Sequence, residues 1–364
     1  SFCVPVYNNA EAAEKLVKGI LVSDDQRFEV IVTDNASTDN AQELLSQIHD
    51  PRFRYIRNIK NLGVHRNWLK ALEIGRGEWL YFVIGRDSIK GEYIPRLIKL
   101  LEYANDNGIT FLYDGYTNSP EPAIISGITA MKCFLGSLHP TGSIFKGELF
   151  SAIPDKEHYF THSDVYPENY LRRDMLLHGK GAMISSGVYT YPSSLVDRKK
   201  VKSTVEHDMN VYDMFYAPRR RTILFFEVLD MVASDLREKF TANEIDDYFN
   251  AKFLTVLYAV SIEWHAFCMN AEWQAHYGQK IKCIGLYEML RNIFKAYSDT
   301  KAHLIEKEIY SHSRQKIMNR NTLKLSVKMM RQMIVRIPLE MVKKPLEFLG
   351  IWQILRSIKR RLIR

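Results

Sequence analysis

Two aspartates follow apolar segments in the first quarter of the chain, and each stands where a carboxylate could bind a ligand. Asp34 comes directly after the run 28–33, and Asp87 closely follows the run 79–84. In open α/β sheets, ligands bind at the carboxyl ends of the strands. A carboxylate at position 34 can accept hydrogen bonds from a nucleobase or ribose, and one at position 87 can hold a divalent cation against phosphate oxygens. The alternative for each is an aspartate that stabilises a turn or caps a helix and takes no part in ligand binding.

The segments that carry these aspartates alternate between strand and helix patterns. β-Branched and aromatic runs predict strands, whereas apolar residues three and four apart predict helices. Such alternation predicts a mostly parallel sheet flanked by helices. Further along, from about 105 to 190, the pattern loosens into short strands at 110–113 and 187–191. In the first part the predicted strands are 2–7, 28–33, 53–57 and 79–84, and the predicted helices are 11–21, one from residue 40, and 64–74.

The rest of the chain, after about residue 208, has an almost entirely helical pattern. Its apolar residues recur at three- and four-residue spacing. We therefore expect an all-helical extension that follows the α/β part. The predicted helices are 212–240, 242–276, 286–297, 301–318 and 322–337.

Composition and charge limit the classes of partner. With 364 residues, 46% hydrophobic and 25% charged, the chain has the make-up of a globular protein with an ample core. The net charge of +8 is uneven, because residues 324–364 carry eleven Lys and Arg against two acids and the remainder sums to −1. This pattern predicts an anionic surface as partner of the tail, and no nucleic acid. Four scattered cysteines and the absence of a signal-peptide pattern predict free thiols in the cytoplasm.

Residues 338–364 form a basic segment with an apolar side. Trp352, Leu355 and Ile358 lie largely along one side of a helix, and Lys359 and Arg360 belong to the basic remainder. Basic residues with aromatic and aliphatic anchors are typical of a helix that lies in a lipid headgroup layer. The alternative is an amphipathic helix packed on the helical region, with a solvated basic face.

The order and spacing of several motifs resemble the amino-terminal half of family 2 glycosyltransferases, which have the Rossmann-like GT-A fold. The motifs are Val4-Pro-Val-Tyr-Asn8, Val30-Ile-Val-Thr-Asp-Asn-Ala-Ser-Thr-Asp39, Asn58 with Asn61-Leu-Gly63 and Asn67, and Gly77-Glu-Trp-Leu-Tyr-Phe-Val-Ile-Gly-Arg-Asp87. The resemblance implies transfer of a sugar from a nucleotide sugar, most often UDP-linked, to an acceptor hydroxyl with inversion. It also implies a donor half at 1–105 and an acceptor half at 106–207. The residue pattern predicts that a helical domain at 208–337 and the membrane-associating segment 338–364 follow.

The resemblance implies roles for individual residues of the donor half. Asp34 would hydrogen-bond the base, and the other implied donor-site residues are Pro5, Tyr7, Asn8, Asn35, Ser37, Asn61 and Asn67. The family's metal motif, Asp-x-Asp, is reduced here to Arg86-Asp87-Ser88. Asp87 would then be the protein ligand of Mg²⁺ or Mn²⁺. The alternative is that Arg86 neutralises the charge of the diphosphate in place of the cation. A degraded, non-catalytic site is the further alternative.

The acceptor half carries two candidates for the general base. In the family an acidic residue before a helix that ends in Gly takes the acceptor proton, and here 161–170 precedes the predicted helix 171–178 and Gly179. Asp164 and Glu168 both fit, and Glu168 is favoured because Glu168-Asn169 falls where many members have Glu-Asp. Either could instead cap the helix. Upstream, 139–146 resembles the stretch that leads into a strand lining the acceptor cleft.

The resemblance, together with the basic segment 338–364, implies an enzyme of surface-polysaccharide assembly, because many bacterial members of the family extend lipid-linked sugars at the membrane. The acceptor would be a glycan or polyprenyl-diphosphate-linked intermediate of O-antigen or capsule type, and the protein would be peripheral on the inner face of the cell membrane. The alternative is a degraded GT-A protein that serves as a membrane-recruited nucleotide-sugar-binding or assembly partner.

Overall fold

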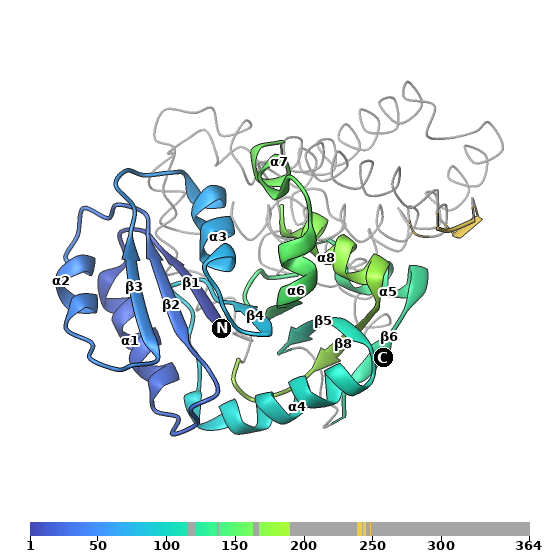
Figure 1. Cartoon of the computed structure of the whole chain (residues 1–364), viewed down its shortest axis with the longest axis horizontal. Helices are drawn as coiled ribbons and strands as arrows, with labels where there is room; N and C mark the ends of the chain where they lie inside the picture. Colours follow the sequence, from blue (N-terminus) through green and yellow to red (C-terminus); the bar gives the residue numbers. More distant parts are fainter. Residues whose placement is uncertain are drawn as a thin grey trace, which may run out of the picture. The chain divides into compact units, whose positions relative to one another are not determined.

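The computed structural model describes most of the first half of the chain (Figure 1). The described residues are 1–115, 121–136, 138–162, 167–189, 239–241, 243–244 and 248. All lie within one compact unit, Ser1–Ala296. The predicted helical region from 208, apart from these few positions, and the basic segment 338–364 lie outside the described residues, as does Asp164.

One mixed sheet forms the centre of the described structure. Its strand order is β3-β2-β1-β4-β7-β5-β8-β6. All neighbouring strands run parallel except β7, which is antiparallel to β4 and β5, and β6, which is antiparallel to β8. The strands are β1 (Phe2–Val6), β2 (Val30–Asp34), β3 (Phe53–Arg57), β4 (Trp79–Phe82), β5 (Ile109–Asp114), β6 (Ala123–Ile125), β7 (Ser143–Lys146) and β8 (Lys180–Ile184).

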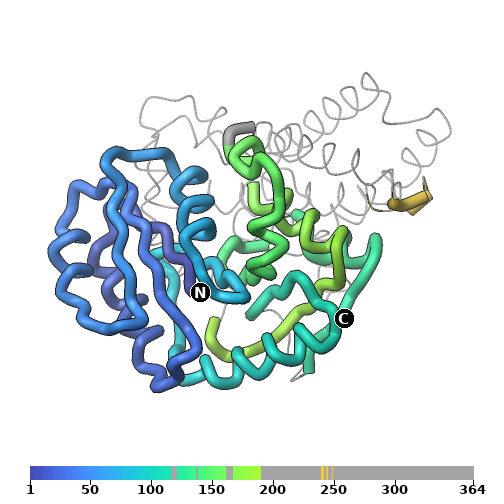
Figure 2. Tube along the Cα trace, in the orientation of Figure 1, coloured from blue at the N-terminus to red at the C-terminus, as the bar shows by residue number. Residues whose placement is uncertain are grey.

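Helices cover both faces of this sheet (Figures 1 and 2). Helices α1, α2 and α4 contribute to the core on one face, whereas α3, α5 and α8 contact strands from the other. No helix of the described part is long and apolar enough to cross a bilayer. The helices are α1 (Ala10–Leu21), α2 (Ala41–Ser46), α3 (Val64–Glu73), the 3₁₀ turn η1 (Gly91–Tyr93), α4 (Ile94–Asp106), α5 (Gly127–Phe134), α6 (Gly147–Ala152), α7 (Lys156–His162) and α8 (Glu168–His178).

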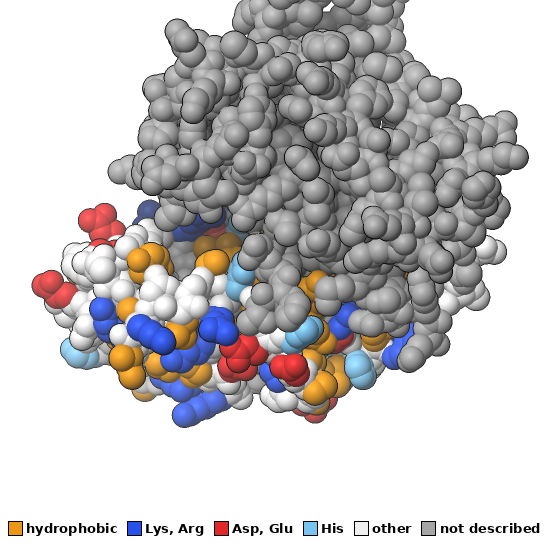
Figure 3. Space-filling view, turned by 90° about the horizontal axis from the view of Figure 1, so that it is seen from above, with side chains coloured by type: hydrophobic (Ala, Val, Ile, Leu, Met, Phe, Trp, Pro, Cys, Tyr) orange, Lys and Arg blue, Asp and Glu red, His pale blue; other side chains and the backbone are white. Residues whose placement is uncertain are grey.

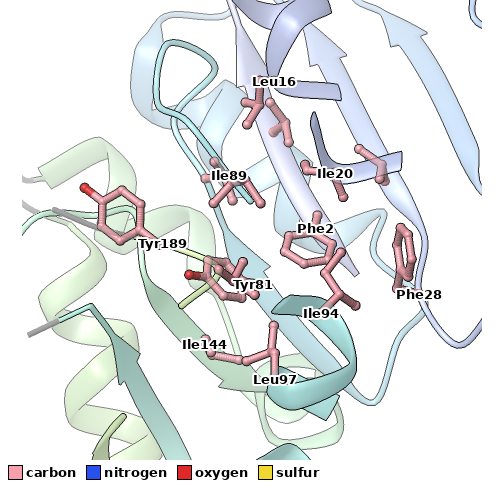
Figure 4. Close-up of a cluster of buried hydrophobic side chains, with 14 of the residues drawn as sticks. Phe2, Leu16, Ile20, Phe28, Tyr81, Ile89, Ile94, Leu97, Ile144 and Tyr189 are labelled. Carbon is pink, nitrogen blue, oxygen red and sulfur yellow. The ribbon is translucent and has the colours of Figure 1, made fainter. Parts of the chain in front are cut away.

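The side chains of each strand point alternately to the two faces of the sheet, so a separate hydrophobic core forms on each face. On the α1 and α4 side, the Phe2 ring lies between Phe28 at 5.8 Å and Tyr81 at 5.1 Å between ring centres (Figure 4). Successive side chains of a strand point to opposite faces. On the other side, Phe111 packs against Phe134 and Phe145 at 5.2 and 5.5 Å. The central strands β1 and β4, which are apolar and buried throughout, are therefore covered on both faces.

The predicted alternation of strands and helices over the first hundred residues is confirmed, but of the strand predicted at 187–191 the described residues 187–189 do not form one. The strand in this region is β8, which directly follows α8. Gly187 has φ +87°, and the Ser186 hydroxyl accepts a hydrogen bond from Val188 N at 2.9 Å. This turn ends the ladder, so Tyr189 keeps only an isolated bridge to Ile89.

The connection into β7 passes very close to the end of β5. Gly142 N donates to Phe82 O at 3.2 Å, and Asp114 N donates to Gly142 O at 2.8 Å. Gly142 has φ +96°, and a Cβ atom there would lie 2.5 Å from Asp114 O. Both the backbone conformation and the space therefore require glycine.

We predict that Gly142→Ala lowers the free energy of unfolding by more than the cost of the left-handed backbone alone, which is about 1–3 kcal/mol. The control is Gly108→Ala, because Gly108 has φ +64° but a Cβ atom there would meet no other atom within 4 Å. Urea unfolding of both variants measures the difference. Equal destabilisation by the two changes would contradict a steric role for Gly142.

Candidate active site

Four polar segments meet at one edge of the sheet. Parallel β2 and β4 end there with Asp34 and, after a turn, Asp87. The segment 139–142 reaches the same edge because β7, which it precedes, runs the opposite way. Helix α8 leads into β8, which is parallel to β5, so its first residue, Glu168, starts at this edge. The carboxyl edge of such a sheet is the expected ligand side.

Asp34 is fully buried and receives four hydrogen bonds. Its Oδ1 accepts from the Ser37 hydroxyl at 2.5 Å and from Ser37 N at 2.9 Å. Its Oδ2 accepts from Tyr55 Oη at 2.6 Å and from an Arg57 guanidinium nitrogen at 2.5 Å. Burial disfavours the charged form, but the hydrogen bonds from Ser37, Tyr55 and Arg57 outweigh it and lower the pKa of Asp34.

These four donors use the usual acceptor capacity of a carboxylate. A base N–H could bind Asp34 directly only by displacing one of them. Arg57 is exposed, and it also donates to Ser37 O at 2.8 Å. The sequence analysis missed Tyr55 and Arg57, although their spacing of two on a strand next to β2 places both on one face.

Several predicted donor-site amides are instead joined in a buried network. Asn35 Nδ2 donates to Asn61 Oδ1 at 2.9 Å. Asn58 Nδ2 donates to Asn67 Oδ1 at 2.9 Å and to Asn35 Oδ1 at 3.1 Å. Asn67 Nδ2 donates in turn to Thr33 O at 2.9 Å. The network ties β2, β3 and α3 together, so these side chains brace the edge around Asp34.

The remaining predicted residues of this side lie around the turn after β1. The Ser37 hydroxyl accepts from Asn8 N at 2.9 Å, and Asn8 Oδ1 accepts from Thr38 N at 2.7 Å. Asn8 has φ +47°, a conformation that Asn tolerates better than most residues. Pro5 is buried within β1, whereas the Tyr7 side chain beyond it is exposed. Of this group, Tyr7 offers an open surface at the edge.

Asp87 lies in a turn that a threonine from a distant segment holds. Asp87 N donates to Ile84 O at 2.9 Å. The Thr141 hydroxyl accepts from Ile84 N at 2.9 Å and donates to Asp87 Oδ2. His139 Nδ1 lies 3.7 Å from the same carboxylate oxygen. Arg86 is exposed beside them. The sequence analysis missed both contacts because they join segments more than fifty residues apart.

His139 is fixed from two sides. Its carbonyl oxygen accepts from Tyr113 Oη at 3.1 Å and from an Arg172 guanidinium nitrogen at 3.4 Å. Its ring stacks on Tyr189 at 6.3 Å between centres with an 18° interplanar angle, and Tyr189 Oη lies 3.3 Å from His139 Nδ1.

The Tyr189 segment is anchored by a buried carboxylate. Asp114 accepts from Tyr81 Oη at 2.9 Å, from Ser186 N at 2.9 Å and from the Ser186 hydroxyl. Burial raises the pKa of Asp114, although the hydrogen bonds from Ser186 and Tyr81 oppose this. Figure 4 shows the hydroxyl groups of Tyr81 and Tyr189 pointing away from Phe2. Asp114 therefore holds together the ends of β4, β5 and β8.

Glu168 is a buried carboxylate without a hydrogen-bond partner on either oxygen in the described structure. Arg172, fully buried one helical turn later, lies 3.7 Å from Glu168 Oε1. Burial raises the pKa of Glu168, and Arg172 partly opposes that shift. An unsatisfied buried carboxylate is costly and is more often found where chemistry requires it. Glu168 lines a small cavity together with Trp68, Leu72, Phe82, Pro140, Ser143, Phe145 and Phe160.

The neighbouring Asn169 instead joins two segments through hydrogen bonds. Its Oδ1 accepts from Gly136 N at 2.8 Å and its Nδ2 donates to Gly136 O at 3.3 Å. This pair of bonds ties the start of α8 to the end of α5. Glu168 and Asn169 therefore have different surroundings, and only Glu168 faces the cavity.

Metal-binding capacity rests on few residues in the described part of the chain. No group of three or more His, Cys, Asp or Glu side chains there could hold an ion by itself. A cation that binds together with substrate phosphates, however, takes only one or two protein ligands. Asp87 and His139, 3.7 Å apart, fit such a shared site.

Comparison with known proteins identifies the class of fold, and a family model matches the first part of the chain. Crystalline TarS (1-349) from S. aureus is 17% identical over 81% of this chain and 80% of that chain, with a TM-score of 0.51. The shared architecture is the GT-A fold. Residues 1–134 match the model of glycosyl transferase family 2.

Curated relatives match parts of the chain. Abequosyltransferase RfbV of Salmonella typhimurium is 24% identical over 59% of this chain and 57% of its own length. Succinoglycan biosynthesis protein ExoO of Rhizobium meliloti is 27% identical over 29% of this chain and 30% of its own length. The chain thus spans less than two thirds of either relative.

We predict that Asp34→Asn destabilises the fold by about 1–3 kcal/mol at pH 7, because at least one buried donor loses its acceptor. The folded pKa of Asp34 is lowered, so its stabilising contribution is full above its ordinary value of about 3.9 and is lost as pH falls through the folded pKa. The difference from wild type should therefore be constant above about pH 5 and shrink below about pH 4.

Urea unfolding at pH 7, 5 and 3.5 measures this difference. The matched control is Asp106→Asn, a change of the same kind at an exposed position near the end of α4. A difference that stays the same size at pH 3.5, or one equal to that of the control, would rule out the anchoring role of Asp34.

Proposed function

We propose that this protein is an inverting glycosyltransferase that moves a sugar from a nucleotide sugar, UDP-linked, to an acceptor hydroxyl. The family 2 domain at 1–134 supports the class of reaction. The observation that carries the mechanism is the buried, unsatisfied carboxylate of Glu168 at the sheet edge that also holds Asp34 and Asp87. These three groups match the three tasks of a sugar transfer: holding the nucleoside, holding the diphosphate and accepting a proton.

The donor would lie along the edge from the Asp34 side toward Asp87. The nucleoside contacts are expected from Tyr7 and Arg57, the exposed groups next to the Asp34 cluster, with Asp34 itself accepting from the base once a protein donor gives way. The diphosphate would then meet Arg86. A cation held at Asp87 would supply further neutralisation of the charge that develops on the departing diphosphate.

Transfer would be a single displacement. The acceptor oxygen forms a bond to the anomeric carbon from the face opposite the diphosphate, and the bond from that carbon to the phosphate oxygen breaks. Glu168 takes the proton of the attacking hydroxyl. Attack opposite the leaving group inverts the anomeric configuration.

Two features suit Glu168 to this role. Its pKa is raised by burial, which makes the carboxylate a stronger base than a solvated glutamate. Arg172, 3.7 Å away, favours the ionised form that accepts a proton. The competing role is structural, since Glu168 is also the carboxylate paired with the buried guanidinium of Arg172. Asp164 remains the other candidate base and lies outside the described residues.

We predict that Glu168→Gln lowers the transfer rate by at least a hundredfold, because the amide cannot take the proton. Release of nucleoside diphosphate from donor sugars measures the rate, and calorimetry with UDP measures donor-site binding, which should be retained. A loss smaller than tenfold would remove Glu168 from the role of base, and Asp164→Asn should then show the large loss.

A second variant separates the base from the counterion. Glu168→Asp keeps a carboxylate opposite Arg172 but withdraws it by one methylene group. We expect a folded protein with a rate between those of wild type and Glu168→Gln. If the rates of both variants follow their thermal stabilities alone, the residue is structural.

We further propose that the acceptor is a lipid-linked glycan at the inner face of the cell membrane, as an intermediate of O-antigen- or capsule-type polysaccharide. The name of the relative ExoO, which assigns it to succinoglycan biosynthesis, supports a polysaccharide product. The basic segment 338–364 supports the membrane location. Figure 3 shows both charge signs and scattered apolar groups on the described part of one face. By sequence, the basic excess of the chain lies in residues 324–364.

We predict that replacing Lys359, Arg360 and Arg361 by Gln weakens binding to phosphatidylserine vesicles by about a hundredfold. Each basic residue near an anionic surface contributes about 1 kcal/mol. Co-sedimentation measures binding. The control replaces the exposed Lys15, Lys18 and Lys99, which changes the net charge equally. An equal loss in both triple variants would show a general charge effect and contradict a dedicated segment.

The second candidate function is a non-catalytic, membrane-recruited partner that binds nucleotide sugars. The single carboxylate of Arg86-Asp87-Ser88 and the occupied acceptor atoms of Asp34 favour it. Nucleotide binding without turnover of any donor sugar, with or without Mn²⁺ or Mg²⁺, would establish this function in place of transfer.

A further inference from the structure

We propose that His139 and Asp87 together bind the divalent cation, with His139 Nδ1 in place of the second carboxylate that Arg86-Asp87-Ser88 lacks, and that the site prefers Mn²⁺ to Mg²⁺. This inference rests on the proposed function, because the cation would meet the diphosphate of the donor. It assigns a ligand that lies 52 positions from Asp87 in the sequence.

The separation of the two groups suits one shared ion. Two ligands that each lie about 2.1 Å from a cation can be at most about 4.2 Å apart. His139 Nδ1 and Asp87 Oδ2 are 3.7 Å apart, within that limit. The two side chains are partly exposed, at 23% and 14%, so an ion and phosphate oxygens can reach them.

The surroundings hold both ligands in place. The buried Thr141 hydroxyl accepts from Ile84 N, which leaves its proton directed at Asp87 Oδ2. The His139 ring is positioned by its stack on Tyr189 and by the two donors to its carbonyl oxygen. Such support of ligands by neighbouring groups is typical of metal sites. Tyr189 Oη, 3.3 Å from Nδ1, would turn its proton away when that nitrogen binds the ion.

The donor atoms determine the metal. Mg²⁺ takes oxygen ligands in a strict octahedron, whereas an imidazole nitrogen favours first-row transition metals. One carboxylate oxygen and one imidazole nitrogen, completed by phosphate oxygens and water, therefore suit Mn²⁺ better than Mg²⁺. For ligation by Nδ1, the ring proton must reside on Nε2.

The test is direct detection of the nitrogen ligand in the full chain with Mn²⁺ and UDP. Pulsed electron paramagnetic resonance should show ¹⁴N modulation from one imidazole in wild type. The modulation should disappear in His139→Gln, and Mn²⁺ affinity should fall at least tenfold in His139→Gln and in Asp87→Asn. His49→Gln, the same change at an exposed position between α2 and β3, should behave as wild type.

Several results would overturn the assignment. They are ¹⁴N modulation that persists in His139→Gln, Mn²⁺ bound by wild type without such modulation, and the absence of Mn²⁺ binding to the UDP complex. Sugar transfer is measured separately. Sugar transfer that proceeds without any divalent ion would contradict the metal site but not the glycosyltransferase activity. Nitrogen-ligated Mn²⁺ without sugar transfer would support the metal site and contradict the proposed enzyme activity.

Discussion

The reversed strand β7, inserted between β4 and β5, is the constraint on which the site depends. Because β7 is antiparallel to both neighbours, the residues before it reach the same edge as the residues that follow the parallel strands. His139 and Thr141 thereby come to Asp87. A parallel strand at this position would have carried them to the opposite edge. Gly142 permits the close passage beside β5 that this insertion requires.

The buried carboxylates at the carboxyl edge of the sheet are of two kinds, which differ in their hydrogen bonds. Asp34 and Asp114 are buried but fully hydrogen-bonded, and they hold turns and strand ends in place. Glu168 is also buried, but among the described residues its oxygens have no hydrogen-bond partner and the charged group recorded beside them is Arg172. An unsatisfied buried carboxylate costs free energy, and this contrast is the reason for the proposal that Glu168 is the base, whereas the hydrogen bonds of Asp34 show a framework role.

Sequence patterns predicted the elements well where the signal is local. Alternating apolar runs and helical spacing are properties of adjacent residues, and the strands and helices of the first hundred residues follow them. The same reasoning failed at 187–189, where β propensity was overridden by a turn that Ser186 and Gly187 form with Asp114. Tertiary hydrogen bonds decided the backbone there, and no local pattern reveals them.

The sequence by itself determined the fold class, the order of the elements in its first part, and the position of Asp34 at one strand end and of Asp87 after another, because these depend on short-range periodicity and motif spacing. Only the tertiary structure decided which groups meet. Strand order and direction brought His139 to Asp87, and the packing of α8 on the sheet buried Glu168 beside a small cavity. Strand order sets contacts between residues that are far apart in the chain, so the partners and the burial of each charge emerge only when the sheet is assembled.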